Sequence, residues 1–168
     1  MIAAALCALL ALTIAGCTTP APPVPTPTPA FATEEEAFAA AEATYRAYVD
    51  ALNARHADPA ASPAPTEFLV GKALESELDT QRTLAEQNRS VVGSAIVTDF
   101  AGTEYGEEIG AVTAVACLDV SESRVLAADG ADVTPAERPG TLKLEIDFVL
   151  VDEGLAVSHS DVAEDQAC

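Results

Sequence analysis

The spacing of apolar residues along the chain changes near Ser90, from the period of a helix to the period of a strand. Before that point, apolar side chains recur at steps of three and four residues, at Phe38, Ala41, Tyr45, Tyr48 or Val49, and Leu52. Such a stripe is typical of an amphipathic helix. Thr33-Glu34-Glu35-Glu36 forms a capping box, in which the threonine oxygen accepts from an orphan backbone N–H. The pattern therefore predicts a first helix after Thr33, which fades into a loop at "NARHADPAASPAP".

A second helix is predicted after this loop, from Thr66 towards Asn88. Its apolar period places three positions towards the interior, at Leu69 or Val70, Ala73 or Leu74, and Leu78. Gly71 lies inside the predicted helix and weakens it by about 1 kcal/mol relative to alanine.

After Ser90, apolar and polar residues alternate, which indicates strands. "SVVGSAIVTDF" and "GAVTAVACLDVSESRVL" (residues 110–126) predict two strands, and "TLKLEIDFVLV" predicts a third, with Leu142, Leu144, Ile146, Phe148 and Leu150 on one face. Asp152-Glu153-Gly154 predicts a hairpin turn into "LAVSHSDV". One face of each strand is polar, as in an antiparallel sheet. Two N-terminal helices followed by about four strands predict an α+β domain with the helices on one face of the sheet.

The first residues differ in character from this domain. Residues 1–16, "MIAAALCALLALTIAG", carry no charge and have the length of a secretory signal, too short to span a bilayer comfortably. The run ends at Ile14-Ala15-Gly16-Cys17, which resembles the lipobox of bacterial lipoproteins. The resemblance implies that the chain is cut before Cys17 and that the Cys17 thiol carries the lipid. No Lys or Arg precedes the run, so either the signal is atypical or translation starts upstream of Met1.

Residues 17–32 are predicted to be a lipid-anchored linker, because they are dominated by Pro, Thr and Ala. Proline holds the backbone in an extended form of about 3 Å per residue, so the segment acts as a semi-rigid spacer. The remaining residues, 33–168, are predicted to form a single domain. We therefore expect a protein on the cell membrane that faces the outside of the cell.

Charge narrows the possible partners. The formal net charge is -19, and the first charged residue is Glu34, so the whole imbalance belongs to the predicted domain. Such a surface repels phosphate backbones and anionic headgroups, which argues against nucleic acid and against electrostatic docking to membranes. Contact with the membrane is therefore expected through the lipid alone.

The segments "AEATYRAYVDALN", "ACLDVS", "ADGADVTPAERPG" and "SDVAEDQAC" resemble small uncharacterised lipoproteins of high-GC Gram-positive bacteria. Those proteins have the nuclear-transport-factor-2-like fold, whose element order and lengths are similar to the ones predicted from Glu34 to Cys168. The resemblance implies a curved antiparallel sheet wrapped around helices to form a cone. This fold hosts isomerases, dehydratases, hydrolases and binding modules, so it selects no function.

The cysteines predict one disulfide. Cys7 leaves with the signal and Cys17 takes the lipid, which leaves Cys117 and Cys168 in the domain. An even pair in an exported protein favours a disulfide over two free thiols. It would close a loop of about 50 residues.

Candidate chemistry is sparse. In isomerases of this fold an acid and a tyrosine act inside the cone, and the possible equivalents are Asp99, Tyr45 and Tyr48, with Asp147 expected to point outward. In "SHSD", neighbouring side chains on a strand alternate faces and are not expected to converge as a triad. Asp129 and Asp132 in "ADGAD" favour a turn over a calcium loop. His56, in the predicted loop, and His159 are far apart, so neither a metal site nor a cofactor is expected.

Three functions remain open from the sequence. The first is a non-enzymatic binding or interaction domain for a small apolar ligand, a cell-wall component or an envelope protein. The second is an isomerase-like or hydrolase-like enzyme that uses a carboxylate in the cone. The third is a structural envelope lipoprotein without a pocket.

Overall fold

The computed structural model describes residues 30–106, 109–152, 154–164 and 168. Two α-helices come first, α1 (Glu34–Ala57) and α2 (Gly71–Glu86), with the short 3-10 helix η1 (Pro65–Phe68) between them. Six strands follow, which are β1 (Ser90–Val92), β2 (Ile96–Gly106), β3 (Ala111–Asp119), β4 (Arg124–Leu126), β5 (Thr141–Val151) and β6 (Gly154–Val162). The fold is therefore α+β, as the sequence predicts.

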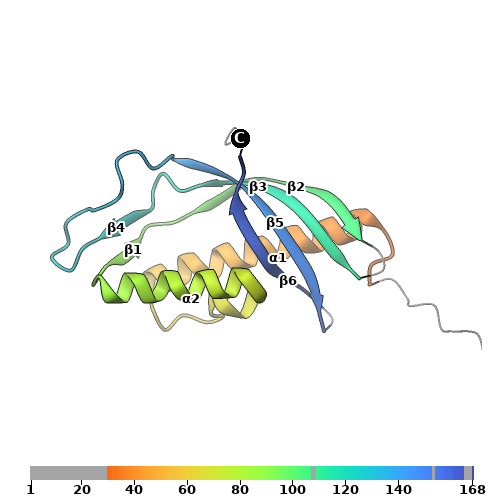
Figure 1. The fold of residues 1–168 in the computed structure, drawn as a ribbon, viewed down its shortest axis with the longest axis horizontal. Coiled ribbons are helices and arrows are strands. Elements are labelled where there is room, and N and C mark those ends of the chain that lie inside the picture. Colours follow the sequence, from red (N-terminus) through yellow and green to blue (C-terminus); the bar gives the residue numbers. More distant parts are fainter. Residues whose placement is uncertain (1–29, 107–108, 153, 165–167) are drawn as a thin grey trace, which may run out of the picture.

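The strands form two sheets instead of one. The main sheet is antiparallel in the order β2-β3-β5-β6, and β1 pairs with β4 in a separate antiparallel ribbon. Helix α1 crosses the main sheet and contacts β2, β3 and β6, whereas α2 lies beside β6 and below the ribbon (Figure 1). Neither described helix combines the length and the hydropathy that a membrane span requires.

The first helix begins where the sequence predicts and ends later. Thr33 is its N-cap, and the Thr33 Oγ1 accepts from the Glu36 N–H at 3.2 Å. The helix continues through Arg55 and His56 to Ala57, so the prediction of a loop from Asn53 is wrong. The reason is a tertiary contact, because the Asn53 amide both donates to the Ala95 carbonyl and accepts from the Ala95 N–H, each at 2.8 Å.

The core lies between α1 and the inner face of the main sheet. Aromatic rings fill its centre, with Phe100 placed 6.2 Å from both Tyr45 and Phe148 between ring centroids. Around the rings, small residues of α1 and β3 allow the helix to approach the sheet, and all of them are buried, at Ala37, Ala41, Ala114 and Ala116. The space between α1 and the main sheet is therefore occupied by the protein's own side chains.

The second helix begins five residues later than predicted. Leu69 is buried and pairs with Val157 of β6, and the Val70 N–H donates to the Val157 carbonyl at 2.9 Å. These contacts hold Val70 extended, so α2 starts only at Gly71, whose φ of +52° suits glycine. No residue of α2 is buried, and Leu78, predicted to face inward, is 45% exposed.

Two predicted strands are each broken in two. Between β1 and β2, Gly93 has a φ of +82°, and a Cβ there would lie 2.0 Å from the Glu122 oxygen. Between β3 and β4 the chain turns, with the Ser123 N–H donating to the Val120 carbonyl at 3.0 Å. The two breaks lie against each other, so β1 and β4 leave the main sheet together as the ribbon.

The third predicted strand is correct, because β5 covers residues 141–151. Ile146 and Phe148 are buried, whereas Glu145 and Asp147 are exposed on the outer face of the sheet. On the same face, Cys117 of β3 is joined to Cys168 by a disulfide with Cα atoms 5.8 Å apart. The expected pairing is therefore present, and it ties the C-terminal residue to the second strand of the sheet.

Candidate functional site

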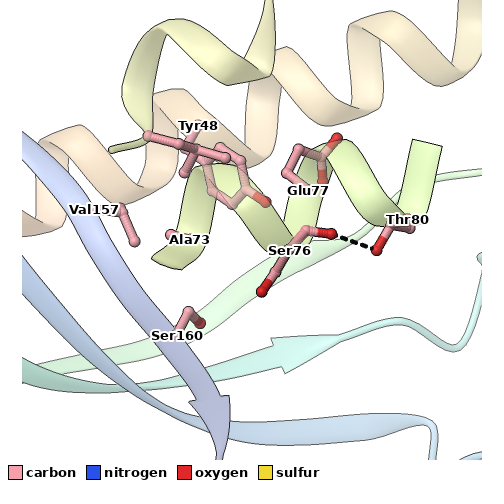
Figure 2. A pocket seen from close by; sticks show the side chains of 8 residues that line it. Tyr48, Ala73, Ser76, Glu77, Thr80, Val157 and Ser160 are labelled. Atoms are coloured by element: carbon pink, nitrogen blue, oxygen red, sulfur yellow. Dashed lines mark hydrogen bonds between the residues drawn. The ribbon is translucent and has the colours of Figure 1, made fainter. Parts of the chain in front are cut away.

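A cleft of about 160 Å³ lies where α1, α2 and β6 meet. Helix α1 contributes Tyr48, α2 contributes Ala73, Ser76, Glu77 and Thr80, and β6 contributes Val157 and Ser160 (Figure 2). The hydroxyl of Thr80 donates to the Ser76 carbonyl at 2.9 Å, so the orientation of the Thr80 side chain is held by a hydrogen bond within α2. The cleft therefore combines an apolar floor with several hydroxyl groups.

Glu77 is the carboxylate nearest to this cleft, and its charge is already matched. Its Oε1 lies 2.5 Å from Arg55 Nη2 and accepts from Gln81 Nε2 at 2.9 Å. The side chains of Arg55 and Glu77 are 22% and 11% exposed, so the pair is largely withdrawn from water. An ion pair in this position links the C-terminal turn of α1 to the middle of α2.

Tyr48 lies beside this ion pair. Burial raises the pKa of the Tyr48 phenol well above its ordinary value, the Glu77 carboxylate raises it further, and Arg55 opposes the shift. The phenol is therefore protonated throughout the physiological range, and it can donate a hydrogen bond but cannot act as a base.

A larger groove separates α2 from the β1–β4 ribbon. It has a volume of about 390 Å³, and its walls are mainly apolar, from Leu84 on α2 and from Val125, Val133 and Pro135 on the ribbon side. Five polar residues also line it, Asp79, Thr80, Thr83, Gln87 and Arg89. Its volume and its mixture of apolar walls with a few polar groups are typical of small-molecule sites.

Of the three candidate pocket residues, Tyr45 and Tyr48 lie together, with ring centroids 5.9 Å apart, but Asp99 does not join them. Tyr45 is buried in the core, Tyr48 lines the small cleft, and Asp99 is exposed on β2, in register with Cys117. A bulge at Thr98 contributes to this placement, because the register shifts between Val97 and Asp99. Asp99 is therefore not the inward acid that an isomerase-like site requires.

Other polar candidates have structural partners. Asp147 faces outward as predicted and accepts from the Thr113 hydroxyl at 3.1 Å. The side chains of "SHSD" do meet in part, since His159 and Asp161 are two residues apart on β6 and lie 2.9 Å from each other. Ser158 donates to the Asp147 carbonyl instead of joining them. The prediction that these side chains cannot converge is thus wrong for His159 and Asp161, although no triad forms.

The predicted turn at "ADGAD" is present. Asp129 and Asp132 accept from the backbone N–H groups of Ala131 and Thr134, at 3.1 and 2.9 Å. Among the residues that the structure describes, no cluster of three or more His, Cys, Asp or Glu side chains could hold a metal ion. The predicted signal, Cys17 and most of the linker belong to residues 1–29, outside the described residues.

Arg55, Glu77 and Leu84 line the clefts, but the sequence pattern does not indicate them as site residues. The pattern predicts a loop at Arg55, where the structure has helix, and a second helix whose inward face includes Leu78 and neither Glu77 nor Leu84. The one signal in the sequence is the small number of basic residues. The whole chain has only eight Lys and Arg, so each of them is a candidate for a specific partner.

Comparison with known proteins assigns no family to the chain. No protein-family model matches the chain, and no curated protein matches it. Among solved structures, it is similar to the intermembrane space region of the chloroplast protein ARC6, with a TM-score of 0.45 and 11% identity over 71% of this chain and 94% of that one. Function is therefore inferred from the clefts themselves.

Proposed function

We propose that this protein is a lipid-anchored, non-enzymatic binding module on the outer side of the cell membrane, with its ligand in the groove between α2 and the β1–β4 ribbon. The observation that carries the proposal is the packing of α2. This helix of 16 residues has no buried residue, and an apolar groove of about 390 Å³ takes the place of a packed neighbour. Apolar walls left open to a groove of this size favour a ligand with an apolar body.

The proposal includes a nuclear-transport-factor-2-like cone, with the ligand outside the cone. Tyr45, Phe100 and Phe148 fill the space between α1 and the sheet. A ligand in the cone would have to displace these rings, whereas the groove beside α2 needs no rearrangement of the core. The groove is therefore the better place for an apolar molecule.

A binding role is favoured over catalysis by the state of the acids. Asp99 is exposed, and Glu77 is neutralised by Arg55 and hydrogen-bonded by Gln81. The Oε1 atom of Glu77 already accepts from both Arg55 and Gln81, so it is not free to take a proton from a bound molecule. Tyr48 is held protonated, so the small cleft has a donor without a matching base.

Binding of N-phenyl-1-naphthylamine, an uncharged apolar fluorophore, tests the groove. We expect saturable enhancement of its fluorescence by the protein, and a loss of affinity of about fivefold in Leu84→Ser, because part of a leucine's burial is removed. Leu78→Ser is the matched control, since Leu78 belongs to the same helix, is 45% exposed and lines none of the clefts described above. Equal effects of the two variants would contradict the proposed location.

A purely structural role is the second candidate, and the filled core favours it. If the protein produces no saturable fluorescence change with the uncharged probe, the groove does not bind apolar molecules, and the structural role replaces the proposal. The anchor is tested separately by Cys17→Ser, which should release the protein from the membrane fraction and abolish acyl labelling. Unchanged membrane retention of this variant would refute the lipid anchor.

A further inference from the structure

A third cleft, of about 310 Å³, lies between the C-terminal turn of α1, the end of α2 and β1. Its lining includes Arg55, His56 and Arg89, together with Gln81 and Ser90, and no carboxylate. The chain has 27 acidic residues against eight Lys and Arg and two His. A cleft with three basic side chains and no acid is therefore the opposite of the rest of the surface, and we name it the basic cleft.

Two of the three basic groups in the basic cleft have unused binding capacity. The Nδ1 atom of His56 is buried and has no hydrogen-bond partner. Arg89 is exposed and forms no ion pair within the part of the chain that the structure describes. Arg55, in contrast, is matched by Glu77. The helix dipole explains why basic residues, Arg55 and His56, occupy the last turn of α1. It does not explain why the buried His56 Nδ1 has no hydrogen-bond partner.

The basic cleft is continuous with the apolar groove. Leu84 and Arg89 line both, so Arg89 lies at the junction of the apolar groove and the basic cleft. A guanidinium binds carboxylate and phosphate oxygens through two parallel hydrogen bonds. The basic cleft thus favours a negatively charged head group on a ligand whose apolar body lies in the groove.

We propose that the ligand is an amphiphile with an anionic oxygen-bearing head, a carboxylate or a phosphate monoester, which Arg89 and His56 bind in the basic cleft. The inference rests on the proposed function for the apolar body of the ligand. The anionic head goes beyond it, because the groove alone would accept a neutral molecule equally well.

The environment of His56 makes the binding depend on pH. Burial lowers the pKa of the ring and the Arg55 charge lowers it further, while a backbone hydrogen bond with Gly93 and the Glu77 carboxylate oppose the shift. Arg89, which also lines the cleft, adds a second positive charge. The ring is therefore neutral at pH 7.5, and an anion beside Nδ1 favours its protonation. Binding takes up a proton, so affinity for the anion rises as the pH falls from 7.5 towards 5.5.

Competition with N-phenyl-1-naphthylamine on the full protein tests the head group. The competitors are 1-octanol, octanoate and octyl phosphate, which share a chain length and differ in the head. We expect at least one anion to bind about tenfold more tightly than octanol, and the order of the two anions identifies the source of the charge. Arg89→Gln should reduce the ratio of anion affinity to octanol affinity to about twofold, a ratio measured within the one variant and so independent of any change in its probe binding.

Two further variants complete the test. Lys72→Gln removes the same charge from α2 outside the basic cleft, where the Lys72 side chain is 67% exposed, and should keep the anion preference. His56→Gln should abolish the rise in anion affinity at low pH. Equal affinity for octanol and both anions, or a preference unchanged in Arg89→Gln, would overturn the inference while leaving the proposed function intact. Failure of the probe itself to bind would overturn the proposed function.

Discussion

Removal of the disulfide should cost the protein about 4 kcal/mol of unfolding free energy. The perturbation is the double variant Cys117→Ser and Cys168→Ser. The two cysteines are 51 residues apart, and in the chain-entropy model a loop of this length restricts the unfolded chain by that amount. Since domains of this size are stable by only about 5 to 15 kcal/mol, the loss is a large share of the total.

Urea unfolding at neutral pH measures this loss. With a slope of about 2 kcal/mol per molar urea, the midpoint should fall by about 2 M, and the slope should rise because the unfolded chain becomes more expanded without the cross-link. The reduced wild-type protein is the control, and its unfolding curve should coincide with that of the double variant. A midpoint shift below about 0.5 M in both would refute the loop-entropy explanation.

Three further predictions address the ribbon, the ion pair and His56. Gly93→Ala should lower the unfolding free energy by about 2 kcal/mol or more, since its Cβ would lie 2.0 Å from the Glu122 oxygen, whereas Gly154→Ala, with no atom within 4 Å, should change it by less than about 0.5 kcal/mol. Glu77→Gln leaves the largely buried Arg55 without a carboxylate and should cost about 2 kcal/mol; Glu75→Gln, in the exposed pair with Lys72, is the control, and an equal cost would argue against the role of burial. The pKa of His56 lies below its ordinary value of 6.5, so the unfolded chain binds the proton more tightly and stability should fall as the pH drops below about 6.5. Unfolding curves recorded between pH 7.5 and 5.5 should show a smaller loss of stability at low pH in His56→Gln than in His159→Gln. An equal loss of stability in the two variants would mean that another group is responsible.

The features that local chemistry controls could be predicted from the sequence. The cap at Thr33 needs only a side-chain oxygen and an N–H three residues later. The alternation in β5 needs only one buried and one wet face, and Ile146 and Phe148 are buried as that pattern requires. The disulfide followed from counting cysteines, because the assignment of Cys7 and Cys17 to the signal and the anchor leaves a single pair.

The clefts could not be predicted, because residues far apart in the chain create them. Asn53 extends α1 through contacts with Ala95, and that extension carries Arg55 and His56 to the side of α2. Leu69 delays the start of α2 by docking on β6, which leaves the helix without a buried face. Arg55 and Glu77 then meet across 22 residues of sequence.

The sequence by itself determined the element types, the cap, the face of β5 and the cysteine pair, since each depends on neighbours in the chain or on a simple count. Only the tertiary structure decided where the helices end, where the strands break and which charges meet. Those outcomes depend on long-range contacts whose free energies exceed local preferences, as the extension of α1 beyond Asn53 illustrates.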